Sequence, residues 1–144
     1  HPAVALVRAR WPLPWLRIAE EVAAVAAERR FQRLLVLGTR YLMDAPVYPV
    51  KLAARGIASA TPDAATREHI NALSFDELVH GRFEPETRAY FASVIGEGRA
   101  RGCDAVVLGC TEIPLIITQS DSRIPVYDTT RIHADAAIEF ALSG

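Results

Sequence analysis

Short apolar runs alternate with helix-forming stretches along most of this chain. The runs that predict strands are residues 15–18, 34–37, 57–60, 105–108 and 126–128. The stretches that predict helices are residues 3–10, 19–30, 46–55, 61–79, 84–101 and 129–142, and three of them are closed by Gly56, Gly81 and Gly102. Strands separated by helices are typical of an α/β fold whose parallel sheet is built with right-handed crossovers.

Two of the predicted strands end in similar sequences. Leu37-Gly38-Thr39 and Leu108-Gly109-Cys110 each close an apolar run with Leu-Gly and a small polar residue. The carboxyl ends of parallel strands meet at one edge of the sheet, where open α/β sheets place their ligand sites. We therefore expect the two sequences to line one crevice, with backbone N–H groups available for an anion. Leu-Gly is a common pair, so the likeness by itself also fits chance.

Composition indicates one globular domain with no nucleic-acid or membrane partner. The chain has 144 residues, is 51% hydrophobic and carries a net charge of −1, which provides no basic surface for nucleic acid. No apolar run reaches the length of a membrane span, and the start at His1 resembles neither a signal peptide nor an initiation site. Two cysteines are too few for a disulfide scaffold, so we expect a reducing, cytoplasmic location. The single lysine, Lys51, lies in a polar-faced helical stretch, which argues against pyridoxal phosphate.

Cys110 is the strongest candidate for a chemical centre. It follows an apolar strand and a Gly, and it precedes Thr111 and Glu112 before the apolar pattern resumes. A thiol whose pKa is lowered by a helix N-terminus or a cation can act as a nucleophile or as a base toward carbon. Thr111 can then bind a carboxylate, and Glu112 can hold a basic group of a substrate or cap the turn. The alternative is a buried, inert cysteine, and the spacing alone leaves both readings open.

The other cysteine and the histidines carry less information. Cys103 lies at the opposite end of the same predicted strand, so we expect it in the core, and Cys-x6-Cys is not a metal-binding spacing. His69 and His80 fall in a surface-like helical region and are expected to be solvated. His133 follows Asp128 and Thr129, either of which is a natural helix N-cap, and it is a candidate substrate-binding residue at the same edge of the sheet.

In these motifs the chain resembles the aspartate/glutamate racemase family. The segments that carry the resemblance are residues 35–43, 77–81, 105–117 and 125–134, and together they span nearly the whole chain. The resemblance implies a cofactor-independent racemase of two similar α/β domains with the active site in the cleft between them. Two cysteines, one from each domain, would face opposite sides of the substrate α-carbon. One would remove the α-proton and the other would return it from the opposite face.

The resemblance also assigns roles to individual residues. Cys110 matches the second catalytic cysteine, and Thr111 and Glu112 match its neighbours in the site. Thr39, in the corresponding Leu-Gly-Thr loop, matches a contact of the substrate carboxylate. The chain is accordingly expected to form a three-layer, Rossmann-like parallel-sheet domain, the second half of a two-domain racemase fold.

Two departures from the family pattern bear on this assignment. The first cysteine of the family lies in an early Cys-Asn-Thr-like motif, and this chain begins at His1, in what resembles the stretch just after it. Cys103 cannot replace that cysteine, so the chain is expected to supply half of a two-base site. Some members carry a Lys two residues before the glycine that matches Gly81, where this chain has Val79, so the exact substrate stays open.

These considerations set the expected domains and partners. Residues 1–30 would be a remnant of the amino-terminal domain and a crossover helix, residues 31–118 the carboxyl-terminal α/β domain, and residues 119–144 a return strand and helix packed on the amino-terminal domain. Apolar faces left uncovered there predict a homodimer. The expected substrate is an amino acid or a dicarboxylic acid. The alternative hypotheses are a related isomerase or decarboxylase of small carboxylic acids and a non-catalytic small-acid binding domain.

Overall fold

Four short parallel strands form the middle layer of the computed structural model, which describes residues 16–143. Their order across the sheet is β2 (Ala58–Ala60), β1 (Arg33–Leu37), β3 (Ala105–Leu108) and β4 (Val126–Asp128). The register pairs Leu37 of β1 with Leu108 of β3. All four residues of β3 are buried, as expected for a central strand that is covered on both faces.

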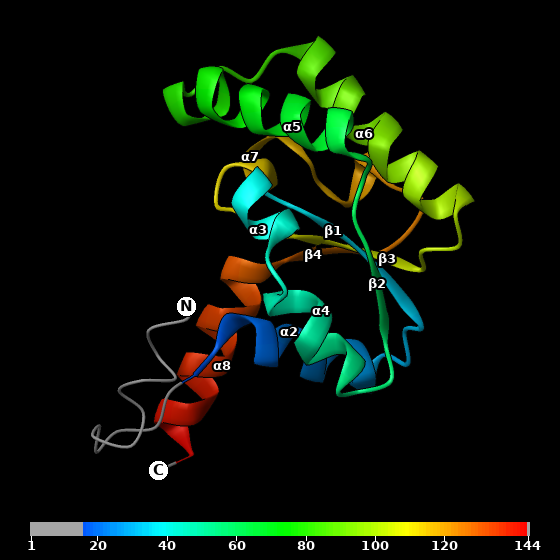
Figure 1. Ribbon diagram of the computed structural model, residues 1–144. Coiled ribbons are helices and arrows are strands. Elements are labelled where there is room, and N and C mark those ends of the chain that lie inside the picture. The colour runs from blue at the N-terminus through cyan, green and yellow to red at the C-terminus, as the bar shows by residue number, and fades with distance from the viewer. Residues whose placement is uncertain (1–15, 144) are drawn as a thin grey trace.

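Helices cover both faces of this sheet, with α5 and α6 on one side and α2, α4 and α8 on the other (Figure 1). The helical segments are α2 (Ile18–Glu28), α3 (Arg40–Asp44), α4 (Val47–Ala53), α5 (Ala64–Asp76), η2 (Leu78–His80), α6 (Pro85–Ala100), α7 (Ile113–Ile116), η3 (Gln119–Asp121) and α8 (Thr129–Leu142). Leu35 packs toward Phe91 of α6, whereas the next residue back, Leu34, packs toward Val22 of α2. This alternation along one strand places an apolar cluster on each face. No helix in the described part of the chain is long and apolar enough to cross a membrane.

The predicted α/β fold with a parallel, three-layer arrangement is confirmed. Strands β1, β3 and β4 and helices α2, α4, α6 and α8 fall on the segments where the apolar pattern predicts them. Gly56 and Gly102 follow α4 and α6 with φ of 73° and 85°. Glycine adopts this left-handed region without steric cost, which explains why both helices end there.

One predicted strand is wrong over its described part. Leu16 and Arg17 belong to no strand, and Ile18 is the first residue of α2. Trp15 and the predicted helix 3–10 lie outside the described residues. The buried residues of α2, which are Ala19, Val22, Ala23 and Ala26, recur with helical spacing, so a helix begins where this apolar run ends.

The predicted helix 61–79 is divided in two. Asp63 accepts a hydrogen bond from the Thr66 N–H at 2.8 Å and starts α5 as its N-cap. The helix ends at Asp76, and Glu77 leaves helical geometry with φ of −121° before η2 begins. The connection from α5 to α6 therefore folds as a hairpin, and Figure 1 shows the two helices lying side by side over one face of the sheet.

Candidate functional site

The turns after β1 and β3 lie side by side at the carboxyl edge of the sheet. The Gly109 N–H donates a hydrogen bond of 2.6 Å to the Leu37 carbonyl, so the ladder continues past the last paired residues. A methyl group on Gly38 would lie 3.5 Å from the Gly109 carbonyl carbon. Thr39 and Cys110, which follow these glycines, therefore occupy equivalent positions at neighbouring strands, as the repeated Leu-Gly sequence predicts.

Leu42 explains why both turns contain glycine. A Cβ on Gly38 would approach a Leu42 δ-carbon to 3.0 Å, and a Cβ on Gly109 would approach both δ-carbons to 2.9 Å. Leu42 lies in α3, which Thr39 caps by accepting a hydrogen bond from the Leu42 N–H at 3.4 Å. The absence of side chains at these two glycines thus lets α3 pack directly on the end of β3.

Cys110 is a half-buried thiol between β3 and α7. Its Sγ accepts a hydrogen bond from the Ile113 N–H at 3.4 Å. Burial raises the pKa of Cys110 from 9.0 to about 11, and the Ile113 and Glu112 N–H groups offset only part of this effect. The carboxylate of Glu112 adds to the increase in pKa because it disfavours a second negative charge nearby. Cys110 is therefore protonated at neutral pH, in contrast to a thiol activated by a helix N-terminus or a cation.

Thr111 and Glu112 form the turn between Cys110 and α7. The Thr111 hydroxyl donates a hydrogen bond to Glu112 Oε1. Thr111 is exposed and Glu112 is half-buried. Since the hydroxyl is engaged by its neighbour, the negative charge of Glu112 is the main polar feature that this turn presents beside the thiol.

The first turns of α8 approach the same edge from β4. Asp128 caps the helix, as expected, by accepting hydrogen bonds from the Thr130 and Arg131 N–H groups at 2.9 and 3.4 Å. His133 lies one turn further along, and its Nδ1 is buried without a hydrogen-bond partner in the described part of the chain. Residues 16–143 contain no group of three His, Cys, Asp or Glu side chains arranged to hold a metal ion.

Thr129 is a buried polar residue that the sequence offers only as an alternative N-cap of α8, and its bond to the neighbouring strand was not predicted. Its hydroxyl donates a hydrogen bond of 3.0 Å to the carbonyl of Leu108, the last residue of β3. On its other side lies Tyr48 of α4, whose pKa is raised by burial and lowered in part by a hydrogen bond with Thr129. The available signal was weak: a Thr in the position directly after an apolar strand.

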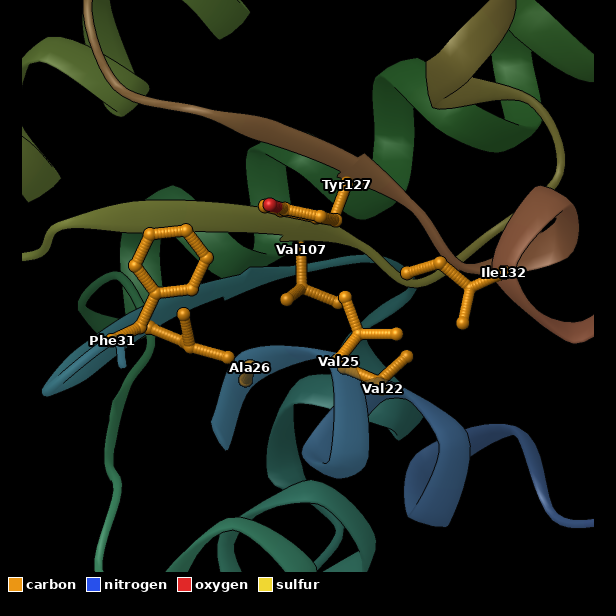
Figure 2. Close-up of a pocket in the computed structure, with 8 residues that line it drawn as sticks. Val22, Val25, Ala26, Phe31, Val107, Tyr127 and Ile132 are labelled. Carbon is orange, nitrogen blue, oxygen red and sulfur yellow. The ribbon is translucent and has the colours of Figure 1, made fainter. Parts of the chain in front are cut away.

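Two cavities of the described chain lie away from Cys110. The smaller, of about 10 Å³, is enclosed between α2, β3, β4 and α8, where Val22, Val107, Tyr127 and Ile132 converge (Figure 2). It is too small for anything larger than one water molecule. The larger, of about 180 Å³, lies between α6 and the loop at Ser122–Ile124.

Cys103 is buried at the start of β3, in the core as expected.

Both the sequence and the fold of this chain are similar to those of known proteins. A family model described as Asp/Glu/Hydantoin racemase matches residues 1–137. The crystal structure of a candidate Asp/Glu racemase from Yersinia pestis superposes with a TM-score of 0.93 at 36% identity, covering 99% of this chain and 62% of that one. An aspartate racemase homologue from Pyrococcus horikoshii OT3 gives 0.90 at 30% identity, covering 98% and 62%. An aspartate racemase from Picrophilus torridus gives 0.69 at 27% identity, covering 91% and 54%. This chain thus spans less than two thirds of the length of these structures.

Proposed function

Because this chain belongs to the Asp/Glu/Hydantoin racemase family, we propose that it forms one domain of a cofactor-independent amino-acid racemase. Cys110 is one of the two acid–base groups in this proposal. The observation that carries it is the position of the Cys110 thiol at the carboxyl edge of a parallel sheet, beside the equivalent Thr39 turn. Residues 31–118 would form this carboxyl-terminal domain, and residues 119–144 a return strand and a helix that packs on the amino-terminal domain.

The protonated state of Cys110 suits the delivery of a proton to carbon. A base on one face of the substrate takes the α-proton, and the electron pair left on the α-carbon is delocalised into the carboxylate. The Cys110 S–H then gives its proton to the opposite face and becomes a thiolate. In the reverse direction that thiolate is the base, and its raised pKa makes it a stronger proton acceptor than an ordinary thiolate.

Four other side chains would hold the substrate in this proposal. The hydroxyl of Thr39 accepts only a long hydrogen bond of 3.4 Å, so its proton is free to bind a carboxylate oxygen. Thr111 lies next to the thiol, and Glu112 offers a negative charge for the substrate ammonium. The buried Nδ1 of His133 is available for a further hydrogen bond.

A second acid–base group is needed to invert the α-carbon. Cys103 is at the amino end of β3 and Cys110 is beyond its carboxyl end, so one strand separates the two thiols. We assign the second group to another part of the full-length protein, because the related structures extend well beyond the length of this chain. A single thiol exchanges the proton on one face but does not invert the centre.

Proton exchange at the α-carbon tests this function. The full-length gene product is incubated in heavy water with each enantiomer of candidate amino acids, and deuterium incorporation and chirality are followed by NMR and chiral chromatography. Cys110→Ala should abolish racemisation of both enantiomers, and deuterium incorporation into the enantiomer whose α-proton Cys110 removes. Cys103→Ala, at the other end of the same strand, is the matched control and should retain them. Racemisation that persists in Cys110→Ala would overturn the assignment, and binding without exchange would favour the small-acid binding domain.

A decarboxylase or related isomerase is the second candidate. A reaction that releases carbon dioxide needs one proton delivered to one face of the resulting carbanion, and a single protonated thiol suffices for this. The same incubations distinguish the two, since a decarboxylase consumes its substrate and incorporates one deuterium into a product without the carboxylate.

Association through α8 is a further part of the proposal. Three large apolar residues in the last turns of this helix, Ile138, Phe140 and Leu142, are exposed. Uncovered apolar surface of this kind usually contacts other protein, and we propose a homodimer. Light scattering coupled to size exclusion is the measurement, and a monomer at high concentration would count against it.

A further inference from the structure

Arginines gather at the amino edge of the sheet, opposite the edge that holds Cys110. Because all four strands are parallel, the segments that lead into them meet at this edge. Each strand is preceded there by at least one exposed arginine, and together these are Arg29, Arg30, Arg55, Arg99, Arg101 and Arg123. None of them lies within ion-pair distance of a carboxylate in residues 16–143. They outnumber the nearby carboxylates of Glu28, Glu97 and Asp104, so this edge carries excess positive charge.

The cavity of about 180 Å³ lies at this edge, where α6 ends and β4 begins. The last turns of α6 form one wall and the loop before β4 forms the other, and Arg99 and Arg123 line the cavity, one from each wall. Ala92 and Gly96 leave the helix wall hollow, since a Cβ on Gly96 would meet nothing within 4 Å. The space is polar and large enough for a small ion with bound water.

Asp121 is the one carboxylate among the described residues that line this cavity, and it is already bound within the fold. It accepts hydrogen bonds from Arg88 Nε and Nη2 at 2.7 and 3.0 Å, and from the Thr118 N–H at 2.9 Å. The hydrogen bonds from Arg88 lower the pKa of Asp121 to about 2. The charges of Asp121 and Arg88 therefore balance each other, and those of Arg99 and Arg123 are left without a counter-charge.

Two other polar groups beside the cavity are engaged inside the fold. The Ser122 hydroxyl donates a hydrogen bond of 2.7 Å to the Ile124 carbonyl. At the end of α6, the Gly98 carbonyl accepts a hydrogen bond of 3.0 Å from the Cys103 N–H, which satisfies an acceptor that a helix end otherwise exposes. A ligand in the cavity would therefore bind mainly to the donors of the two arginines.

We propose that this cavity binds a phosphate group. Arginine presents its N–H donors in a planar fork that matches two oxygens of a phosphate, whereas a halide ion offers no such pair. An arginine on each wall, at an edge with excess positive charge, suits an anion with several oxygens. Inorganic phosphate and the phosphate of a small phosphorylated metabolite share this chemistry. The site is independent of the function proposed for Cys110, which lies at the other edge of the sheet.

Isothermal titration calorimetry of the full-length gene product tests the proposal. The ligands are inorganic phosphate and glycerol 1-phosphate, with sodium chloride at equal ionic strength as the reference. We expect saturable binding of the phosphate ligands and none of chloride. Arg123→Gln should weaken this binding on the order of 10-fold to 100-fold, because it removes charge-assisted hydrogen bonds. Tighter binding of glycerol 1-phosphate would identify a phosphorylated metabolite as the ligand, and equal binding would identify free phosphate.

Two further variants distinguish the cavity from the general charge of the edge. Arg55→Gln removes an arginine beside β2, three strand spacings or roughly 14 Å from β4, and should change the affinity less than about two-fold, since salt screens a charge at that distance. Gly96→Leu fills the cavity from an exposed helical position with open space, so the protein should fold, as thermal denaturation will check, and lose binding.

Three results would overturn the proposal. The first is the absence of saturable phosphate binding in the unaltered protein. The second is an equal loss of affinity in Arg55→Gln and Arg123→Gln, which would assign the binding to the charge of the whole edge. The third is full binding by a folded Gly96→Leu protein, which would place the ligand outside the cavity.

Discussion

The Thr129 hydroxyl donates a hydrogen bond of 3.0 Å to the carbonyl of Leu108, the residue that ends the strand leading to Cys110. Both residues are almost fully buried. The bond joins the start of α8 to the end of β3, at the point where strand pairing between β3 and β4 stops at Leu108 and Asp128. The position of the Gly109–Cys110 turn thus depends on a side chain that comes from the far end of the sequence.

Replacing Thr129 by Val should loosen this junction. The substitution keeps the shape of the side chain but leaves the Leu108 carbonyl buried without its donor, which costs about 1–3 kcal/mol of unfolding free energy. Thr129→Ser retains the hydroxyl and should recover most of that loss. Urea denaturation measures both variants. A Thr129→Val variant as stable as the unaltered protein would show that the hydrogen bond contributes nothing.

Glu112 should control the acidity of the Cys110 thiol. Its carboxylate contributes to raising the pKa of Cys110 to about 11, so Glu112→Gln should lower this pKa and increase the thiolate fraction at pH 8 to 9. The pH dependence of alkylation by iodoacetamide, read by mass spectrometry at the Cys110 peptide, measures the shift. Glu97→Gln in α6 serves as the control. An unchanged or higher pKa in Glu112→Gln would contradict the electrostatic coupling.

The raised pKa of Cys110 should also appear in the pH dependence of folding. The unfolded thiol has a pKa near 9, and the folded one a pKa of about 11. The contribution of the protonated Cys110 thiol to the free energy of unfolding is therefore fully present below pH 9. It is lost as the pH rises toward 11, because the thiol of the unfolded chain releases its proton first. The loss amounts to at most roughly 3 kcal/mol, since each pKa unit corresponds to about 1.4 kcal/mol. Unfolding free energies of the unaltered protein and of Cys110→Ala, measured from pH 7 to 10.5, should converge along this range. Parallel curves would contradict the shift.

The apolar pattern of the sequence predicted the strands and helices that are long enough for their buried residues to show the period of the element. Strand β3 reads Ala-Val-Val-Leu and is buried throughout, and α6 runs for 16 residues to its glycine stop. Helices α3 and α7 were not predicted, since five and four residues do not complete two helical turns. Their formation depends on Leu42 and Ile113 packing into the core, which is a tertiary effect.

The candidate site was predictable in its positions but not in its electrostatics. The repeated Leu-Gly sequence indicates that Thr39 and Cys110 share an edge, because the register of parallel strands follows from local pattern. The pairing of Arg40 with Glu68 and the bond from Thr129 to Leu108 join residues separated by 28 and 21 positions. Contacts of that kind depend on the finished fold, as does the burial that raises the pKa of Cys110.

Two glycines of α6 allow the packing of this helix on the sheet to be measured. A Cβ on Gly98 would lie 2.5 Å from a δ-carbon of Leu35, which is fully buried in β1, whereas a Cβ on Gly96 would meet nothing within 4 Å. Gly96→Ala should therefore stabilise the protein by roughly 0.5–1 kcal/mol through helix propensity alone. Gly98→Ala has the same gain in helix propensity, but its new methyl group must displace Leu35, which destabilises the protein by roughly 1–3 kcal/mol.

The difference between these two alanine variants isolates the contact between α6 and β1, because their helix-propensity terms cancel. Thermal or urea denaturation of both proteins provides the measurement, and Gly98→Ala is expected to be the less stable of the two. The combination of Gly98→Ala with Leu35→Val should recover part of the loss, since the shorter side chain removes the δ-carbon that the new methyl group meets. Equal stabilities of the two single variants would mean that α6 can move away from the sheet without cost, in conflict with the buried position of Leu35.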